Sequence, residues 1–230
     1  MEEAHKLTHR PRGVMGADYH DDRLKSPGPR YRLRRRGWEA ARIIKQYAPA
    51  DPRLLDLGTA DGLMLEHLAS LTKPALAVGI DLSLELLRTN ARKYPIVMAD
   101  VEKLPFPSSS FDAVIAAAIL EHVPYPDRFV SEIHRVLRPS GICVITTPVP
   151  LFEEIAAKLG FLKEEDHQET FPLKKVAALL SSHGFAMLET EKFMMSPVGF
   201  PAEQVIEKLM KRIGLSALLL NQIVAARRAQ

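Results

Sequence analysis

The chain has 230 residues, of which 47% are hydrophobic and 26% are charged, a composition typical of a globular protein long enough to bury a full core. Its net charge is +3, but residues 1–36 hold ten Lys or Arg against five Asp or Glu, so they contribute +5 and the remainder contributes −2. The single cysteine, Cys143, excludes an internal disulfide, and nothing in the sequence suggests a cysteine-based metal site. There is no apolar signal region at the N-terminus, and the longest apolar run, 113–120, is too short to span a bilayer, so we expect a cytoplasmic protein.

Residues 1–36 form a basic N-terminal arm that scatters Pro and Gly among its charges without any period, so we expect it to be mobile. A helical pattern at Arg32–Tyr47 overlaps the end of this arm. A single domain is expected at 37–230. Expected strands then fall at 53–57, 75–81, 95–100, 111–119 and 142–147, expected helices at 63–71, 83–93 and 127–137, and a turn at 139–141. The C-terminal part has expected helices at 151–162, 173–182 and 203–213 and two expected antiparallel strands at 186–193 and 222–228.

Alternation of strands and helices predicts an α/β fold, a doubly wound and mostly parallel sheet with helices on both faces. Three of the expected strands end in, or run into, an acidic residue: Asp56, Asp81 and Asp100. Because the carboxyl ends of parallel strands meet at one edge of a sheet, and ligands bind beyond that edge, these acids mark the predicted binding site.

The turn after the first strand, Asp56-Leu-Gly-Thr-Ala-Asp-Gly62, indicates the kind of ligand. Gly58 and Gly62 allow a tight turn whose N–H groups and helix dipole suit a carboxylate or phosphate. However, Asp56 and Asp61 would repel a pyrophosphate, and the G-x-G-x-x-G fingerprint of dinucleotide sites is absent, which disfavours NAD. A nucleotide-like ligand with positive charge fits better, and S-adenosylmethionine carries both an ammonium and a sulfonium.

The next two acids extend this site. Asp81 stands 23 residues after Gly58, where a carboxylate can accept hydrogen bonds from both ribose hydroxyls. Asp100 offers an acceptor for the adenine amine, and the N–H of Val101 offers a donor for a ring nitrogen. Asp112, by contrast, is expected to face solvent at the amino end of its strand.

These motifs, together with Leu104-Pro-Phe106, Leu120-Glu-His122 and Leu137-Arg-Pro-Ser-Gly141, resemble class I S-adenosylmethionine-dependent methyltransferases of the type 11 branch, related to those of ubiquinone and menaquinone biosynthesis. The resemblance covers 53–147 and implies a Rossmann-like, seven-stranded sheet with an antiparallel C-terminal strand. The positions it assigns to the cofactor are Asp56, Gly58, Thr59, Ala60, Gly62, Asp81, Leu82, Asp100, Val101 and Ala117. The sequence departs from the family at Ala60, where a second glycine is usual, and at Thr59, where cysteine is common.

Two histidines are predicted at the methyl-transfer end of the site. A general base is needed only when the acceptor arrives protonated, as a hydroxyl does. His122 follows the fourth strand, and His167 lies in a loop that could close over the site; cofactor packing or helix capping for His122, and a solvated loop for His167, are the alternatives. No group of residues has the spacing of metal ligands.

The acceptor is predicted from weaker signals. The stretch 116–122 lacks the Asn/Asp-Pro-Pro-aromatic turn of many enzymes that methylate amino groups of bases or glutamine. An insertion at 148–171 is a predicted acceptor lid, and its apolar residues, with the basic, Leu-rich segment 203–220, suit an isoprenoid or lipid-linked acceptor, although both segments could equally be core. We therefore predict methyl transfer to O or C of a small molecule.

Two alternatives stay open: a non-catalytic S-adenosylmethionine-binding module, and an RNA methyltransferase that uses the basic arm. Within that arm, the run Arg30–Arg36 could bind phosphates, contact an anionic membrane surface as a peripheral protein, or be the solvated start of a helix.

Overall fold

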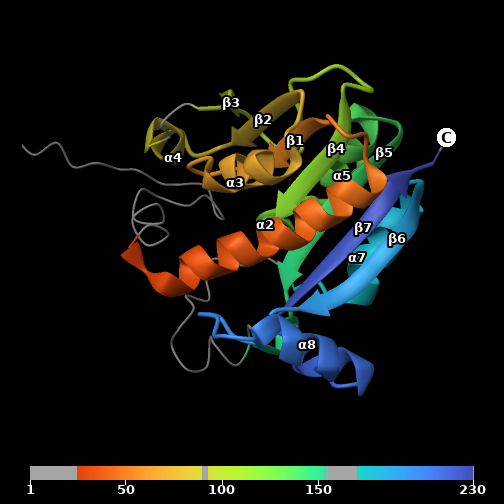
Figure 1. Cartoon of the computed structure of the whole chain (residues 1–230). Coiled ribbons are helices and arrows are strands. Elements are labelled where there is room, and N and C mark those ends of the chain that lie inside the picture. The colour runs from red at the N-terminus through yellow and green to blue at the C-terminus, as the bar shows by residue number, and fades with distance from the viewer. Residues whose placement is uncertain (1–24, 90–92, 153, 155–169, 230) are drawn as a thin grey trace, which may run out of the picture.

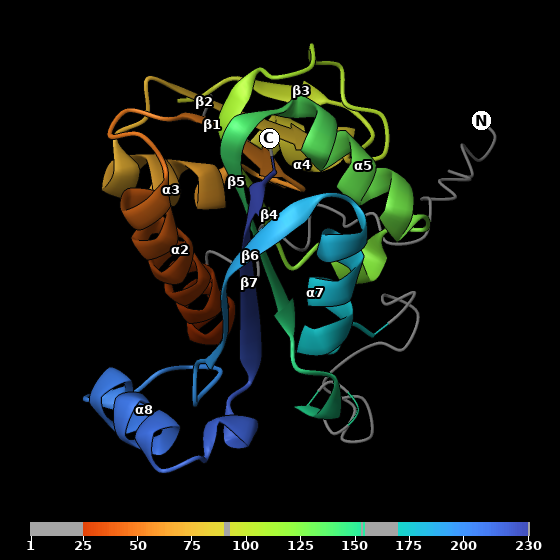
Figure 2. The ribbon, with the colours of Figure 1, turned by 90° about the vertical axis from the view of Figure 1, so that its right-hand side faces the viewer.

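The computed structural model describes residues 25–89, 93–152, 154 and 170–229, which form a seven-stranded sheet covered by helices on both faces (Figures 1 and 2). The strands are β1 Arg53–Leu57, β2 Leu76–Asp81, β3 Ile96–Met98, β4 Phe111–Ala117, β5 Leu137–Pro148, β6 Phe185–Phe193 and β7 Asn221–Arg228. The helices are α2 Pro27–Tyr47, α3 Leu63–Thr72, α4 Leu84–Thr89, α5 Pro126–Val136, α7 Leu173–Ser182 and α8 Glu203–Arg212, with short 3-10 turns η1 Leu120–His122 and η3 Ser216–Leu218.

The order of strands across the sheet is β3-β2-β1-β4-β5-β7-β6. Neighbouring strands among β1 to β5 pair in parallel, whereas β7 runs antiparallel to both β5 and β6. The predicted fold class is therefore confirmed, including the antiparallel C-terminal strand. Strands β2 and β3 are added on one side of β1, whereas β4 and β5 are added on the other, so the carboxyl ends of β1 and β4 form the switch point of the sheet.

Two apolar layers hold the helices to the sheet. On one face α2 and α3 pack through residues such as Ile43, Ile44 and Leu65. On the other face α5 and α7 pack through Phe129, Leu180 and their neighbours (Figure 2). Alternate residues of β1, β2, β4, β5 and β7 enter opposite layers, as the period of two in a strand requires. The continuous apolar runs that predicted these strands are thus buried on both faces.

The long connection between β6 and β7 emerges at the carboxyl edge of the parallel strands. In the register of the sheet, Asn221 at the start of β7 faces both Pro148 at the end of β5 and Phe193 at the end of β6. Residues 194–220, which include α8, therefore lie at the same edge as the ends of β1, β2 and β4.

Helix α2 begins earlier than the sequence predicts. It starts at Pro27 rather than Arg32, so the last ten residues of the predicted arm are helical. Proline is compatible with the first turn of a helix, because its missing N–H would have no partner there. Arg35, assigned to the arm, is buried against the domain at 2% exposure.

The expected turn at 139–141 is instead part of β5. Leu137 already pairs with Phe111, and the register then jumps to Ile142 opposite Ala113. The surplus residues of β5 form an irregularity in which Ser140 adopts a φ of +65°. At the same place Asp112 accepts hydrogen bonds from the backbone N–H of Arg53 and from the guanidinium of Arg138, and its side chain is only 13% exposed, so the expectation that it faces solvent is wrong.

Parts of the C-terminal prediction fall outside the described residues. The predicted helix at 151–162 and lid at 148–171 include residues 153 and 155–169, and His167 is among them. Their roles stay predictions. Within the described part of the chain, no helix has both the length and the apolar character needed to cross a membrane.

Candidate functional site

The turn after β1 forms the floor of the site. Gly58 has a φ of +66°, and a Cβ atom there would lie 2.3 Å from Cδ1 of Ile119, which follows β4. Only a residue without a side chain allows Ile119 to approach the turn this closely. Gly62, with a φ of +81°, directly precedes α3, so the predicted strand, turn and helix start are present.

Asp81 fixes the shape of this turn from the neighbouring strand. Its Oδ2 accepts a hydrogen bond from the N–H of Ala60 at 2.8 Å, and its Oδ1 accepts one from the N–H of Ser83, also at 2.8 Å. A carboxylate has about four lone-pair sites, so both oxygens keep capacity for a ligand's hydroxyl groups. The structure thus gives Asp81 a positioning role that the sequence does not reveal.

Thr59 ties the same turn to β2. Its N–H donates to the carbonyl of Ile80 at 2.9 Å, and its side chain packs so closely on Gly79 that a Cβ there would lie 2.7 Å away. The Thr59 hydroxyl is buried and has no hydrogen-bond partner among the described residues. The turn is therefore fixed to the sheet through backbone and side chain together.

Asp100 lies beyond β3, in a loop whose backbone is held by two charged residues of α5, Glu132 and Arg135. Its Oδ1 accepts from the N–H of Glu102 at 2.8 Å. Glu132 of α5 accepts from the N–H of Leu104, and Arg135 donates to the carbonyls of Leu104 and Phe106, the latter at 2.7 Å. The hydrogen bond from Arg135 lowers the pKa of Glu132.

The remaining predicted cofactor residues lie at the same edge of the sheet. Ala117 ends β4 beside the switch point, and Val101 is buried after Asp100. Leu82, directly after Asp81, is 47% exposed. The predicted set is thus brought to one side of the sheet, along the ends of β1, β2, β3 and β4.

Buried acids give this edge its electrostatic character. Asp56 and Asp61 are exposed by only 1% and 3%, and Glu121 in η1 by only 2%. Carboxylates are rarely buried to this extent without a functional or structural reason. Glu121 has no assigned role in the sequence interpretation, although its place directly before His122 offered a signal. A negative site at the switch point suits a cationic ligand.

His122 occupies the predicted position after β4. It ends η1, its N–H donates to the carbonyl of Ile119 at 2.8 Å, and its side chain is half-buried. In the described part of the chain no cluster of three or more His, Cys, Asp or Glu has the arrangement of a metal site.

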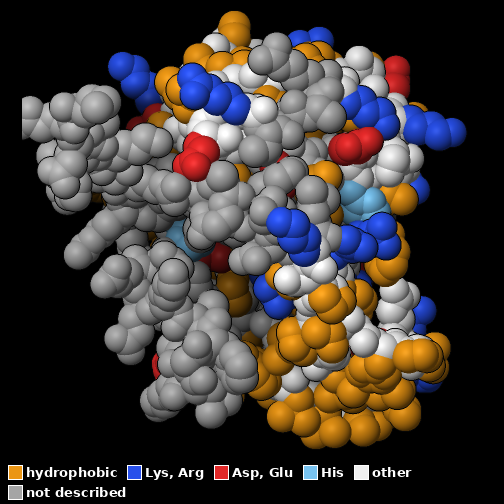
Figure 3. Space-filling view, turned by 90° about the vertical axis from the view of Figure 1, so that its left-hand side faces the viewer, with side chains coloured by type: hydrophobic (Ala, Val, Ile, Leu, Met, Phe, Trp, Pro, Cys, Tyr) orange, Lys and Arg blue, Asp and Glu red, His pale blue; other side chains and the backbone are white. Residues whose placement is uncertain are grey.

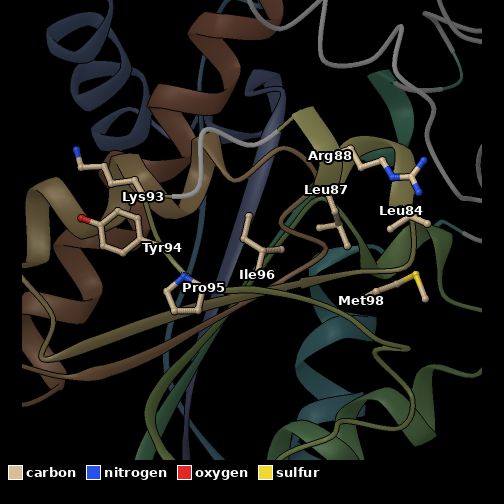
Figure 4. A pocket seen from close by; sticks show the side chains of 8 residues that line it. All are labelled: Leu84, Leu87, Arg88, Lys93, Tyr94, Pro95, Ile96 and Met98. Atoms are coloured by element: carbon tan, nitrogen blue, oxygen red, sulfur yellow. The ribbon is translucent and has the colours of Figure 1, made fainter.

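A separate cavity of about 540 Å³ lies at the outer edge of the sheet, between α4 and β3 (Figure 4). It is lined by Leu84, Leu87, Arg88, Lys93, Tyr94, Pro95, Ile96 and Met98. None of the predicted cofactor residues lines it, but its lining residue Met98 pairs with Asp81 in the sheet, so the cavity borders the outer end of the acidic edge.

S-adenosylmethionine fits the residues at the acidic edge. The buried carboxylates match its two positive charges, and Asp81 retains acceptor capacity for its ribose.

Comparison with known proteins agrees with this geometry. Residues 55–145 match the family model described as a methyltransferase domain. The chain is 32% identical over 134 residues to malonyl-[acyl-carrier protein] O-methyltransferase of Legionella pneumophila, a match that covers 55% of this chain and 47% of that protein. It is 28% identical over 167 residues to demethylmenaquinone methyltransferase of Chlorobaculum parvum, covering 71% of this chain and 66% of that protein.

Among solved structures, an S-adenosylmethionine-dependent methyltransferase from Mesorhizobium loti superposes with a TM-score of 0.63 at 22% identity, covering 84% of this chain and 98% of that one. This likeness shows the shared fold. The chain spans about half the length of the Legionella protein that it matches. Residues 55–145 are thus similar to the methyltransferase domain family, and the likeness to the Mesorhizobium loti protein shows that the chain shares its fold.

Proposed function

We propose that this chain is an S-adenosylmethionine-dependent methyltransferase that moves a methyl group to oxygen or carbon of a small-molecule acceptor of isoprenoid or lipid-linked type. The observation that carries the proposal is the row of carboxylates, Asp56, Asp81 and Asp100, at or just beyond the carboxyl ends of three adjacent strands beside the switch point. The names of the relatives support the acceptor class, since one acts on an acyl-carrier conjugate and another on demethylmenaquinone.

Each residue has a defined task in this proposal. Asp56 and the turn to Gly62 would hold the methionine part of the cofactor, Asp81 its ribose, and Asp100 with Val101 its adenine. When bound, the cofactor supplies a methyl group on a positively charged sulfur, which is an effective leaving group. The protein then mainly excludes water and aligns the acceptor with that methyl group, which accounts for a large part of the acceleration.

His122 is the proposed base for an acceptor that arrives as a hydroxyl. It lies at the end of η1, next to the switch point. His167 remains a second proposed base on the predicted lid. For an acceptor carbon that is already activated, neither histidine needs to move a proton.

The basic stretch 30–36 gives less support to RNA as the acceptor. Arg35 bonds Glu39 and Glu207, and Arg36 donates to Asn221 at 3.0 Å, so these two side chains bind inside the protein rather than to a phosphate backbone. A nucleic-acid surface is usually built from Lys and Arg clustered on an exposed face.

Calorimetric titration with S-adenosylmethionine tests the cofactor site. We expect Asp81→Ala to weaken binding by roughly tenfold or more, since a charge-assisted hydrogen bond contributes about 1.5–3 kcal/mol. Asp81→Asn, which keeps an acceptor for the turn, should lose less. Asp112→Asn removes an acid at the opposite edge of the sheet and should bind normally. Unchanged affinity in Asp81→Ala would contradict the assignment.

The acceptor is tested separately by incubating the protein with S-adenosylmethionine labelled in its methyl group and with fractionated cell extract. We expect the label in the lipid phase. Label in the RNA fraction would replace the proposed acceptor class. Tight cofactor binding without transfer to any fraction would favour the non-catalytic module.

A further inference from the structure

Helix α8 turns its acidic residues inward and its large apolar residues outward. Glu203 and Glu207 are each only 3% exposed, whereas Val205, Leu209 and Ile213 are 69%, 58% and 61% exposed. In a surface helix of a globular protein the apolar stripe normally faces the core. The spacing that predicts this helix is therefore correct, but its apolar face is not part of the core.

The buried acids explain how the helix is held in this orientation. Glu207 receives Arg35 Nη2 of α2 at 2.7 Å and Lys211 Nζ at 2.8 Å. Glu203 accepts from the N–H groups of Met195 and Ser196 at 2.7 and 2.8 Å, and Tyr31 of α2 also donates to it. These contacts satisfy the acids within the protein, so their negative charge does not contribute to the outer surface of α8.

What remains outside is a contiguous apolar surface with positive charge. We name it the α8 face; it is the orange region at the lower right of Figure 3. Its exposed apolar residues include Val198, Val205, Leu209, Ile213, Leu215 and Leu218. In 193–220, all of which the structure describes, the only acids are the two buried glutamates, and the exposed charges are Lys208 and Arg212.

The α8 face lies at the functional edge of the molecule. The segment that carries it connects the ends of β6 and β7 next to Pro148, at the carboxyl end of β5. The predicted cofactor residues follow β1, β2 and β3 at the same edge. A surface that contacts the α8 face would thus be close to the entrance of the site.

We propose that the α8 face docks the protein onto the surface of an anionic lipid bilayer. A helix that combines exposed large apolar side chains with Lys and Arg, and no exposed acid, has the composition of an interfacial membrane helix. The basic residues match anionic headgroups, and the apolar residues match the acyl boundary. A second copy is a poorer match, because a symmetric contact would place Lys208 and Arg212 of both copies against one another with no exposed acid to pair with them. The proposal does not depend on which acceptor is methylated.

Co-sedimentation with vesicles tests the proposal. The full chain is mixed with one of two kinds of vesicle. The neutral vesicles contain phosphatidylcholine alone, and in the anionic vesicles about one lipid in three is phosphatidylglycerol. We expect stronger binding to the anionic vesicles. The triple variant Val205→Ser, Leu209→Ser and Ile213→Ser should bind at least roughly tenfold more weakly to both kinds. Lys208→Gln with Arg212→Gln should lose about fivefold to 25-fold, and only on anionic vesicles, because each basic residue contributes about a fivefold factor there.

Matched controls separate docking from misfolding. Met98→Ser removes an apolar side chain with the same 58% exposure as Leu209 from β3, the outermost strand on the far side of the sheet from β6, and should bind vesicles normally. Lys45→Gln with Lys73→Gln removes two exposed charges at the amino edge and should also bind normally. All variants should keep the wild-type circular dichroism spectrum and affinity for S-adenosylmethionine.

Three outcomes would overturn the proposal. The first is no binding of the full chain to vesicles of either composition. The second is binding that the triple variant retains, which would assign the contact to another surface, such as the basic arm. The third is a dimer in solution that the triple variant converts to a monomer while vesicle binding is absent, which would assign the α8 face to a second copy of this chain.

Discussion

Helices α5 and α8 are both strongly amphipathic, yet they face the protein with opposite sides. Helix α5 buries its apolar residues Phe129, Val130, Ile133 and Val136 against the sheet and exposes its charges. Helix α8 buries Glu203 and Glu207 and exposes its apolar residues. The contrast shows that a helical period predicts a two-sided helix but not which side faces inward. That choice depends on what the rest of the chain offers: apolar strands beneath α5, and Arg35 with Tyr31 beneath α8.

The largest effect is expected in the apolar contact of α5. Phe129→Ala removes a fully buried ring. We expect it to lower the free energy of unfolding by about 4 kcal/mol, since a buried Phe→Ala change costs about 3–5 kcal/mol. Urea unfolding followed by circular dichroism measures this loss. Ser131→Ala, on the exposed side of the same helix, is the control and should change stability little; a small effect of Phe129→Ala would contradict a tightly packed contact.

The ionic contact of α8 should come next. Arg35→Met removes the cation between Glu39 and Glu207 and leaves Glu207 buried with Lys211 as its remaining cation. We expect a loss of about 3 kcal/mol, because breaking a buried pair leaves a charge uncompensated. The same urea titration measures it. Arg34→Met, one residue away and exposed, should behave like the wild type; if both variants unfold alike, the ion pairs do not hold α8.

Acid should weaken the ionic contact and not the apolar one. Burial raises the pKa of Glu39, but hydrogen bonds from Arg35 and Arg42 outweigh it and leave the pKa below its usual 4.5. A lowered pKa in the folded state contributes stability above the usual pKa, and this stability is lost as the pH falls through the lowered value. Between pH 6 and pH 3.5 (about the range in which glutamates titrate) the wild type should lose about 1 kcal/mol more than Glu39→Gln. Parallel stability curves for the two proteins would argue against this contribution.

The smallest effect is expected on the exposed face of α8. Leu209 is 58% exposed, so Leu209→Ser should change the free energy of unfolding by no more than about 0.5 kcal/mol. Ile133→Ser, the equivalent change on the buried face of α5, is the contrast and should be severe. A large loss for Leu209→Ser in urea unfolding would mean that this side chain packs within the fold after all.

Strands β1, β2 and β4 could be predicted because each is an apolar run between breakers, and a buried parallel strand needs nothing more. The start of α2 could not be predicted in this way. Proline interrupts a helix everywhere except in its first turn, and the sequence does not show that Pro27 and Pro29 lie in the first turn of α2. The orientation of α8 was beyond prediction for another reason. It depends on Arg35 reaching Glu207 from 172 residues away, and local sequence holds no trace of that contact.

The site shows the same division. The positions of Asp56, Asp81 and Asp100 at strand ends follow from the sequence, because acids directly after apolar runs are visible there. The hydrogen bond from the N–H of Ala60 to the carboxylate of Asp81 could not be predicted from the sequence. It joins two turns that only the pairing of β1 with β2 brings together. The burial of Glu121 was missed because its neighbours in sequence, unlike its neighbours in space, include a polar histidine.

The hydrogen bond between the N–H of Ala60 and the carboxylate of Asp81 constrains how this site can change over evolutionary time. Ala60 has a φ of +52°, a conformation that disfavours side chains and that glycine adopts without cost. Its N–H is held in place by Asp81. Replacing Asp81 would therefore release a strained residue as well as remove an acceptor, so a substitution at 81 is best tolerated after Ala60 has become glycine. In descendants of this chain, changes at the two positions should occur in that order.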